Sequence, residues 1–564
     1  MRTITLLIPT ALLALLMTSC KPAQTDESRL RDFIASHLKQ VEPKTTAMNI
    51  AEWNANATGE KKYYDENAAL DLDIKRIRSN RAGFAFLKQL KEGNTIHDSL
   101  LRRQLTVLYN NYFKNQIDTS LLRAIVEKQS AISSKFNTFR GKIDGKEVSD
   151  NDISNVLKDE KNVEKRKKAW EASKQVGKEV APMVVELVKL RNQAAKQLGF
   201  DNYYVMALAT DEQDENNIIR IFDDLKQLTD EPFAQMKHDL DARLAKKFGI
   251  QPKQLRSWHY EDPFFQEAPQ SPGVNLDAFF KGKNIEELGR TFYAGLNLPV
   301  EDILKNSDLT PRKGKYQHAF ENDIDRAGDV RVMLSISDDH YWTSTLLHEL
   351  GHGVYSKYVD RNLPYLIRVE AHTFLTEAIA QLMERQCYNP DWLQTMVNIT
   401  DKDKEAVRRT QHENLRSKEL VFSRWSQVMV RFERSMYQNP DQDLNKLWWD
   451  LVQEYQLVTR PENRNEPDWA AKIHLAQYPC YYHNYMLGEL AASQILNAIV
   501  TKVEKQPAIA EISFAQKPAI GEFLKKQIFM PGASLHWNDL LKHSTGEGLT
   551  PKYFAEEFVG KRIG

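Results

Sequence analysis

The segment His348-Glu349-Leu350-Gly351-His352 decides how the rest of this sequence is interpreted. At this composition, an accidental HExxH pattern is expected only about 0.02 times per chain. Residues four apart lie on one face of a helix, so both imidazoles can reach one zinc ion at Zn–N distances of about 2.0–2.1 Å. Glu349 then lies beside them, positioned for a metal-bound water rather than for the metal. The flanking residues predict a helix from about Trp342 to Val359.

Catalysis at such a zinc ion needs a third protein ligand and an open fourth position. Three downstream carboxylates, those of Glu370, Glu377 and Glu384, are seven residues apart and can share one helix face. Glu377 is the strongest candidate, because a lone glutamate in the apolar run 375–380 is costly to bury without a partner. We expect Glu370 and Glu384 to lie on a solvated face. The predicted ligands of a single zinc ion per chain are His348, His352 and Glu377.

The sequence on both sides of this motif predicts a mainly α fold. Residues 29–245 alternate charged and apolar side chains at helical spacing, as in Asp71–Lys91, Ser120–Phe136 and Val163–Leu198. A short strand is predicted at Val330–Ile336, where β-branched residues alternate just before the zinc helix. Helices are expected to continue to the C-terminus.

Composition and charge restrict the possible functions. The chain has 564 residues with 77 Lys+Arg against 77 Asp+Glu and no basic stripe, which argues against a nucleic-acid partner. No internal repeat or low-complexity linker divides residues 29–564, which we expect to form one domain. After Cys20 only Cys387 and Cys480 remain, so a disulfide framework is excluded. We expect two buried free thiols, and one bridge between them is the alternative.

The N-terminus has the features of an export signal. Arg2 provides the positive start, and Ile4–Met17 is an apolar stretch too short to span a membrane. It runs into Thr18-Ser19-Cys20, which resembles a bacterial lipoprotein signal. We expect residues 1–19 to be a lipoprotein-type signal peptide, Cys20 to be lipidated, and residues 20–28 to form a polar tether. An ordinary signal peptide is the alternative. In either case the protein is expected outside the cytoplasm, in the bacterial periplasm or at the outer membrane.

Several segments together resemble the angiotensin-converting enzyme family, the peptidyl-dipeptidase A group. The similarity spans most of the chain, more loosely in the N-terminal third. It implies a zincin-like, mainly helical ellipsoid of two lobes around a deep channel, with a small β-sheet beside the zinc helix. The segments that carry it are His318-Ala319, residues 329–332, the HExxH motif, Leu363-Pro364, Arg368, residues 377–379, Trp448-Trp449, residues 472–474, Tyr485 and residues 531–537.

This resemblance also implies which residues perform peptide hydrolysis. It assigns the same three zinc ligands and makes Glu349 the general base for the attacking water. Tyr485 and His474 are then the hydrogen-bond donors to the oxyanion.

Substrate binding is implied at four further positions. His318 and Ala319 match residues that bind the peptide backbone, with Ala319 on an edge strand that pairs with the substrate. Lys472 and Tyr482 match positions that hold the free C-terminal carboxylate.

A few positions depart from the family pattern. Gln381 stands where the family has an aspartate that supports a zinc histidine, and we expect its amide to orient the imidazole. One more residue separates His352 from Glu377 than in the animal enzymes. Val452 and Asn484 stand where family arginines hold chloride, which predicts weak or absent chloride activation. The sequence offers no match for the family glutamine that helps to hold the substrate carboxylate.

Three functions are consistent with these observations. The favoured one is a dipeptidyl carboxypeptidase acting on oligopeptides. The zinc spacing and the aromatic segment 481–485 are shared with the thimet oligopeptidase family, so a short-peptide endopeptidase is the alternative. A non-catalytic peptide-binding lipoprotein is the third, and the complete ligand set with Glu349 argues against it. We expect a monomer whose only membrane contact is the lipid anchor.

Overall fold

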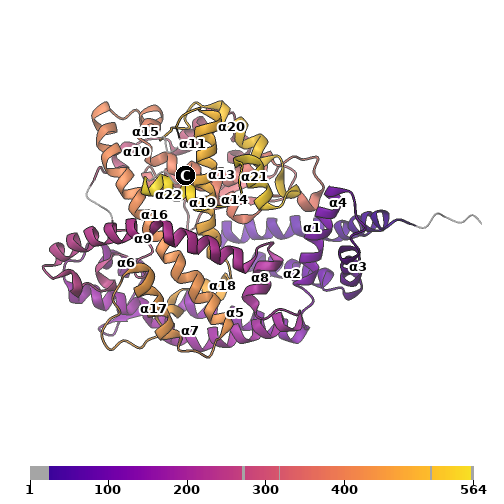
Figure 1. The fold of residues 1–564 in the computed structure, drawn as a ribbon, viewed down its shortest axis with the longest axis horizontal. Helices are drawn as coiled ribbons and strands as arrows, with labels where there is room; N and C mark the ends of the chain where they lie inside the picture. Colours follow the sequence, from indigo (N-terminus) through magenta and orange to yellow (C-terminus); the bar gives the residue numbers. More distant parts are fainter. Residues whose placement is uncertain (1–23, 270–272, 317, 508–510, 561–564) are drawn as a thin grey trace, which may run out of the picture.

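The computed structural model describes residues 24–269, 273–316, 318–507 and 511–560, and helices make up most of this part of the chain (Figure 1). Within it, strands form only two small sheets of two antiparallel strands each. The prediction of a mainly α fold is confirmed. No helix of the described residues is long and apolar enough to cross a membrane. The predicted signal peptide and Cys20 lie outside the described residues.

The first half of the chain forms long helices and one small sheet. Their bounds are α1 (Asp26–Thr58), α2 (Lys61–Arg78), α3 (Arg81–Gly93), α4 (Ser99–Phe113), α5 (Thr119–Thr138), β1 (Gly141–Ile143), β2 (Lys146–Val148), α6 (Asp150–Asp159), α7 (Val163–Gln197), α8 (Tyr203–Thr210) and α9 (Glu215–Phe248).

The second half contains the other sheet and more helices. Their bounds are α10 (Asp277–Phe280), α11 (Ile285–Gly295), α12 (Glu301–Asn306), β3 (Phe320–Asp323), β4 (Val330–Met333), α13 (His340–Tyr358), α14 (Thr373–Arg385), α15 (Pro390–Val397), α16 (Asp401–Gln438), α17 (Leu444–Gln456), α18 (His474–Gln477), α19 (His483–Ala498), α20 (Pro518–Leu524), α21 (Trp537–Thr545) and α22 (Lys552–Val559). Short 3-10 and π-helical segments are η1 (Pro252–Gln254), η2 (Ser257–His259), η3 (Tyr365–Ile367), η4 (Gln386–Tyr388), η5 (Asp468–Ala471), η6 (Ile499–Val503), η7 (Lys525–Phe529) and η8 (Gly532–Ser534).

Two large hydrophobic cores organise these helices. The first core is built mainly from α11, α13, α14, α19 and α20 to α22, which gather in the upper part of Figure 1. The second core is built mainly from α5, α7, α9 and α17, in the lower part. Helix α16 supplies buried residues to both cores, such as Val430 to the first and Trp425 to the second. Helix α9 does the same, with Phe222 in the first core and Phe233 in the second, so two long helices tie the cores together.

Helix ends in the N-terminal region differ from the sequence prediction in two places. The helix predicted at Asp71–Lys91 is broken, because the Asn80 side chain accepts a hydrogen bond from the Gly83 backbone at 2.7 Å and starts α3. Helix α1 begins at Asp26, capped by Thr25, so the predicted tether to residue 28 is wrong in its last three residues. Helices α5 and α7 match their predicted ranges within three residues.

The sheet next to the zinc-motif helix is short. Strand β4 ends at Met333, three residues before the predicted end, and pairs with β3 in the register Phe320↔Met333. Both strands contact α13. The expected small sheet beside the helix of the HExxH motif is thus present.

Candidate active site

The two histidines of the HExxH motif lie on one face of α13. The helix starts after Asp339, whose side chain accepts a hydrogen bond from the Trp342 backbone, and continues through the motif to Tyr358. The Nε2 atoms of His348 and His352 are 3.2 Å apart. This geometry agrees with the prediction from their four-residue spacing.

Helix α14 approaches α13 closely, because no side chain separates the helices at Gly351. A Cβ atom added there would lie 2.8 Å from the Cα of Ala380. The close approach brings Glu377 beside the histidines, with Oε2 3.7 Å from the Nε2 of His348. The ligand atoms of His348, His352 and Glu377 all lie within 4.8 Å of one another, and no other such group is found among the described residues.

The donor set fits a catalytic zinc ion. Two imidazoles and one carboxylate are a common catalytic zinc ligand set, and tetrahedral Zn–N bonds place two nitrogens about 3.3 Å apart. The observed 3.2 Å separation of the imidazole nitrogens matches that value. Both nitrogens face Glu377, and Glu349 is buried on the same helix. The site can therefore hold the metal with little rearrangement.

The outer nitrogens of the two histidines have partners that the sequence did not reveal. The Nδ1 of His348 lies 2.9 Å from Oε2 of Glu384, and the Nδ1 of His352 lies 2.8 Å from the Thr376 hydroxyl. The prediction that Glu384 lies on a solvated face is wrong, because its side chain is only 22% exposed and pairs with His348 and Lys418.

The prediction that Gln381 orients a zinc histidine is also wrong. Both Nδ1 atoms are already held by other side chains, and the buried Oε1 of Gln381 has no hydrogen-bond partner among the described residues. Glu370, the other carboxylate assigned to a solvated face, lines a cavity with Ser356 and Val369.

Several titratable groups are buried together at this site. Burial raises the pKa of Glu349 to about 7 and also raises that of Glu377. Burial lowers the pKa of His348, but its hydrogen bond to Glu384 and the nearby carboxylates outweigh this effect and raise it to about 9. Burial and the neighbouring His348 hold the pKa of His352 well below its usual value. Burial is the largest single cause at each of these groups, and only at His348 do the neighbouring carboxylates outweigh it.

Two adjoining cavities give access to this site. One has a volume of about 1090 Å³ and is lined by His348, Glu349, Glu384 and Lys418. The other has a volume of about 950 Å³ and is lined by β3 and by residues of α1 and α2. His318 and Ala319 line both cavities. Ala319 lies just before β3 rather than within a strand, and within the described residues β3 pairs only with β4.

Lys472 lies among aromatic rings beside the second core, a setting called the Lys472 pocket, with its Nζ 5.4 Å from the ring centroid of Phe264 and 5.3 Å from that of Trp425. Its Nζ donates a hydrogen bond to Oε1 of Gln266 at 2.6 Å and lies 5.6 Å from the ring centroid of Tyr482. The Trp425 indole donates to the Tyr482 hydroxyl at 2.6 Å. Burial lowers the pKa of Lys472 to about 8. An ammonium group, an amide and a phenol thus converge in one place.

Gln266 is a residue of this candidate site that the sequence analysis missed. It lies in the segment rich in Pro, Trp and Phe at 250–290, where no helical or strand spacing marks any side chain. Its neighbour Glu267 lines the larger cavity. It thus supplies an amide beside Lys472, where the sequence analysis had found no glutamine.

Three predicted residues form an aromatic cluster between the two sides of the cleft. The ring of His474 lies 5.2 Å from Tyr482 and 6.4 Å from Tyr485, and the two tyrosine rings are 5.3 Å apart. Burial, followed by the charge of Glu377, raises the pKa of Tyr485 to about 12. Burial lowers the pKa of His474 to about 4, so its imidazole is neutral at pH 7.

The positions of the family chloride arginines have different environments here. The Oδ1 of Asn484 accepts a hydrogen bond from the Gln213 amide at 2.9 Å, and the other end of that amide lies 2.6 Å from His483. Val452 is buried in the second core. Cys387 and Cys480 are both buried and free, so the expectation of two free thiols is confirmed.

Comparison with known families agrees with this geometry. A family model described as angiotensin-converting enzyme matches residues 24–552, which covers nearly the whole chain. The match includes the metal site, the Lys472 pocket and Gln266. The chain belongs to the angiotensin-converting enzyme family of zinc metallopeptidases.

Proposed function

We propose that this protein is a zinc-dependent peptidyl-dipeptidase that removes C-terminal dipeptides from oligopeptides, with one zinc ion per chain. The observation that carries the proposal is that Tyr485 links a metal site to a site able to bind a carboxylate. His348, His352 and Glu377 can hold the metal. The Lys472 pocket has the chemistry to bind a free carboxylate. Tyr485 lies between them, since it contacts the ring of Tyr482 and its pKa responds to Glu377.

Glu349 is the general base in this proposal. A zinc ion bound at the site lowers the pKa of a coordinated water and polarises the scissile carbonyl. Glu349 accepts a proton from the attacking water and passes it to the leaving amine. Glu349 is buried and lines the larger cavity together with His348, which places it beside the proposed metal position.

Tyr485 and His474 donate hydrogen bonds to the oxyanion that forms on the substrate carbonyl. The raised pKa of Tyr485 keeps its phenol protonated at neutral pH. The neutral imidazole of His474 retains one N–H, and its buried Nδ1 has no hydrogen-bond partner among the described residues. Both groups are therefore available as donors.

Substrate binding uses the two cavities and the Lys472 pocket. His318 and Ala319 contact the peptide backbone where the cavities meet, and the free edge of β3 extends this path. Lys472, Gln266 and Tyr482 hold the C-terminal carboxylate. Binding of the carboxylate restores a counterion to a lysine whose charge is disfavoured by burial.

We further propose that the protein is an exported bacterial lipoprotein. Residues 1–19 and Cys20 have the pattern of a lipoprotein signal. Its membrane contact is limited to the lipid anchor, its partner is an oligopeptide rather than a nucleic acid, and it acts as a monomer in the periplasm or at the outer membrane. Metabolic labelling with a radioactive fatty acid, compared between wild type and Cys20→Ala, tests the anchor. Equal labelling of both proteins would contradict it.

The decisive experiment for the activity is mass spectrometry of products from a synthetic decapeptide. The peptide is supplied as the free acid and as the C-terminal amide, with and without a zinc chelator. Sequential loss of dipeptides from the free acid alone is expected. Internal cleavage of both peptides would instead identify a short-peptide endopeptidase. Absence of all cleavage by zinc-loaded protein would overturn the peptidase assignment and favour a non-catalytic peptide-binding protein.

A further inference from the structure

We propose that Glu384 and Lys418 position the zinc ligand His348, and that Glu384 replaces the carboxylate that is missing at Gln381. This inference rests on the proposed zinc site and adds two positioning residues to it. A histidine ligand commonly donates its outer N–H to a carboxylate, which fixes the ring and strengthens the nitrogen as a ligand.

The three side chains form one continuous chain of contacts across three helices. His348 on α13 lies 2.9 Å from Oε2 of Glu384 on α14. The other carboxylate oxygen, Oε1, accepts a hydrogen bond from Nζ of Lys418 on α16 at 3.3 Å. All three residues line the larger cavity. Each oxygen of Glu384 thus has its own partner, and the carboxylate plane is fixed.

Gln381 does not share this role, because Glu384 and Thr376 hold the two outer nitrogens and the Oε1 of Gln381 has no hydrogen-bond partner among the described residues. It lies three residues before Glu384 on the same helix, one turn closer to the Glu377 ligand. Its Oε1 would be 3.0 Å from a Cβ atom at Gly488, so the amide points toward α19. The residue that the family pattern singles out therefore faces away from the histidines, and the carboxylate one turn later contacts His348 instead.

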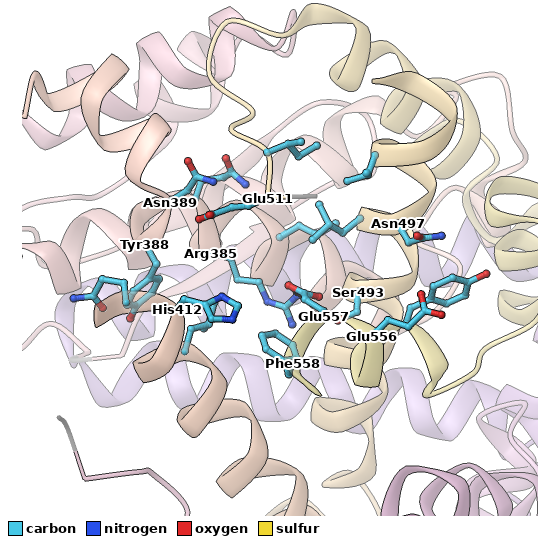
Figure 2. Close-up of a pocket in the computed structure, with 18 residues that line it drawn as sticks. Arg385, Tyr388, Asn389, His412, Ser493, Asn497, Glu511, Glu556, Glu557 and Phe558 are labelled. Atoms are coloured by element: carbon cyan, nitrogen blue, oxygen red, sulfur yellow. Dashed lines mark hydrogen bonds and ion pairs between the residues drawn. The ribbon is translucent and has the colours of Figure 1, made fainter. Parts of the chain in front are cut away.

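Helix α14 is fixed from its other side by the next residue, Arg385. Figure 2 shows Arg385 in a cavity behind α14, together with Ser493, Glu557 and Phe558. Arg385 pairs with Glu489 on α19 and with Glu557 on α22. The adjacent residues Glu384 and Arg385 therefore point to opposite sides of α14, the first toward His348 and the second toward α19 and α22. Arg385 is engaged with these acids, which leaves Lys418 as the cation for Glu384.

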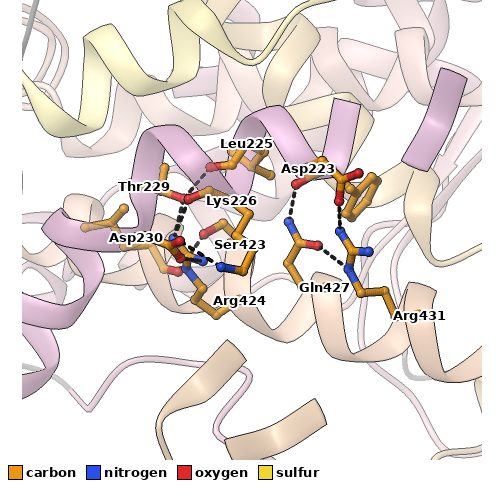
Figure 3. A network of polar contacts seen from close by, with 11 residues as sticks. Asp223, Leu225, Lys226, Thr229, Asp230, Ser423, Arg424, Gln427 and Arg431 are labelled. Atoms are coloured by element: carbon orange, nitrogen blue, oxygen red, sulfur yellow. Dashed lines mark hydrogen bonds and ion pairs between the residues drawn. The ribbon is translucent and has the colours of Figure 1, made fainter. Parts of the chain in front are cut away.

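Helix α16 is fixed a short distance beyond Lys418. Figure 3 shows this helix joined to α9 by a polar network. Arg424 donates to Asp230 and to the Thr229 hydroxyl, each at 2.6 Å, and Arg431 pairs with Asp223. These contacts hold the backbone of α16 in place. The ion pair with Lys418 therefore limits the movement of the Glu384 side chain.

The two residues are expected to contribute unequally. Glu384 contacts the ligand directly, and its side chain is 22% exposed. Lys418 acts through Glu384, and its side chain is 45% exposed, so solvent screens much of its charge. Loss of Glu384 should weaken zinc binding more than loss of Lys418, and loss of both should cost little more than loss of Glu384 alone.

Zinc affinity, measured by competition with a chromophoric chelator and without substrate, tests the proposal. Glu384→Gln is expected to weaken binding about 10- to 100-fold, as for other partners of zinc histidines. Lys418→Met should weaken it about threefold, since its ion pair is partly solvated. Gln381→Leu, on the same helix and of similar size, is the matched control and should stay within about twofold of wild type. Glu384→Gln/Lys418→Met should resemble Glu384→Gln.

Two further measurements separate positioning from general stability. The thermal unfolding midpoint of the metal-free proteins should be similar for Glu384→Gln and Gln381→Leu. The visible spectrum of the Co²⁺-loaded protein should change in Glu384→Gln and not in Gln381→Leu. Glu384→Asp should recover part of the zinc affinity. Wild-type affinity in Glu384→Gln, or an equal loss in Gln381→Leu, would overturn the proposal.

The result is independent of the proposed peptidase specificity. A wild-type protein that binds zinc but releases no dipeptides would contradict the proposed function and leave this test intact. A wild-type protein that binds no zinc would contradict both.

Discussion

The metal side and the carboxylate side of the cleft are built from contacts of very different range along the chain. On the metal side, His348 and His352 are four residues apart, and their outer partners Glu384 and Thr376 lie within 36 residues of them. On the carboxylate side, Lys472 contacts Gln266 across 206 residues. The first arrangement follows from two packed helices, whereas the second exists only after distant segments have met.

We expect the metal side to serve the chemical step and the carboxylate side to serve substrate binding. The metal side contains the proposed general base Glu349 next to the three clustered ligands. The carboxylate side contains a cation that is held ready for an anionic partner. Substitutions on the metal side should therefore lower kcat, and substitutions on the carboxylate side should raise KM. Substitutions of Glu349 and Lys472 and the pH dependence of KM test that division.

The largest effect is expected for Glu349→Gln. Without a base, the attacking water keeps its proton, so kcat should fall at least about 1000-fold. The zinc content, measured by plasma mass spectrometry, should match wild type, because Glu349 is not one of the three clustered ligands. If the variant retained a tenth of wild-type turnover, Glu349 could not be the general base.

Lys472→Met should act on the other side of the cleft. Loss of the ammonium group should reduce kcat/KM for free-acid peptides about 100-fold, mostly through KM, because a carboxylate would be buried without its cation. The same peptides as C-terminal amides should be cleaved slowly and almost equally by both proteins. Gln266→Ala is the milder companion, with an expected loss of about tenfold. A fall in kcat at unchanged KM would break the proposed division.

The pH dependence of KM tests the role of Lys472 in the wild-type protein, with Lys472→Met as the control. Burial lowers the pKa of Lys472 to about 8, so its ammonium form is lost as the pH rises through that value. KM for free-acid peptides should be flat below pH 8 and rise about tenfold per pH unit well above it. Lys472→Met should show no such rise. A wild-type KM that stays flat to pH 10 would contradict a titrating lysine in the pocket.

The smallest effect is expected for chloride. Asn484 is engaged with Gln213 and Val452 is buried in the second core, so the positions of the family arginines present no cation. Replacing acetate with chloride at constant ionic strength should change kcat/KM by less than about twofold, which separates a specific effect from screening. A severalfold rise would show that chloride reaches the site through other residues.

The sequence was sufficient for those parts of the protein in which local spacing determines geometry. The helices Val163–Gln197 and His340–Tyr358 follow from periodic apolar residues, and the zinc triad follows from an HExxH motif and one glutamate in an apolar run. The helix predicted at residues 71–91 was wrong, because a local side-chain cap at Asn80 competes with continuation of the helix.

Other parts of the site depend on contacts that spacing does not reveal. Glu384 is a charged residue at helical spacing, a pattern that usually marks a solvated face, and only the packing of α13, α14 and α16 places it on His348. Gln266 lies in an irregular segment, and its role depends on Lys472 more than 200 residues later. In the sequence, Gln266 is marked only by the acidic residue Glu267 next to it. Such a pair is too common to identify a site.

Helix α16 has a consequence for the size of the product. It carries Lys418 next to the metal site and, seven residues later, Trp425 next to the carboxylate pocket. Two helical turns span about 10.5 Å, and two extended residues span about 7 Å. In the proposed peptidyl-dipeptidase, this one helix links the metal site to the carboxylate pocket and fixes their separation. We expect product length to be unchanged in Gln266→Ala, and product masses that change in that variant would show that other contacts set the separation.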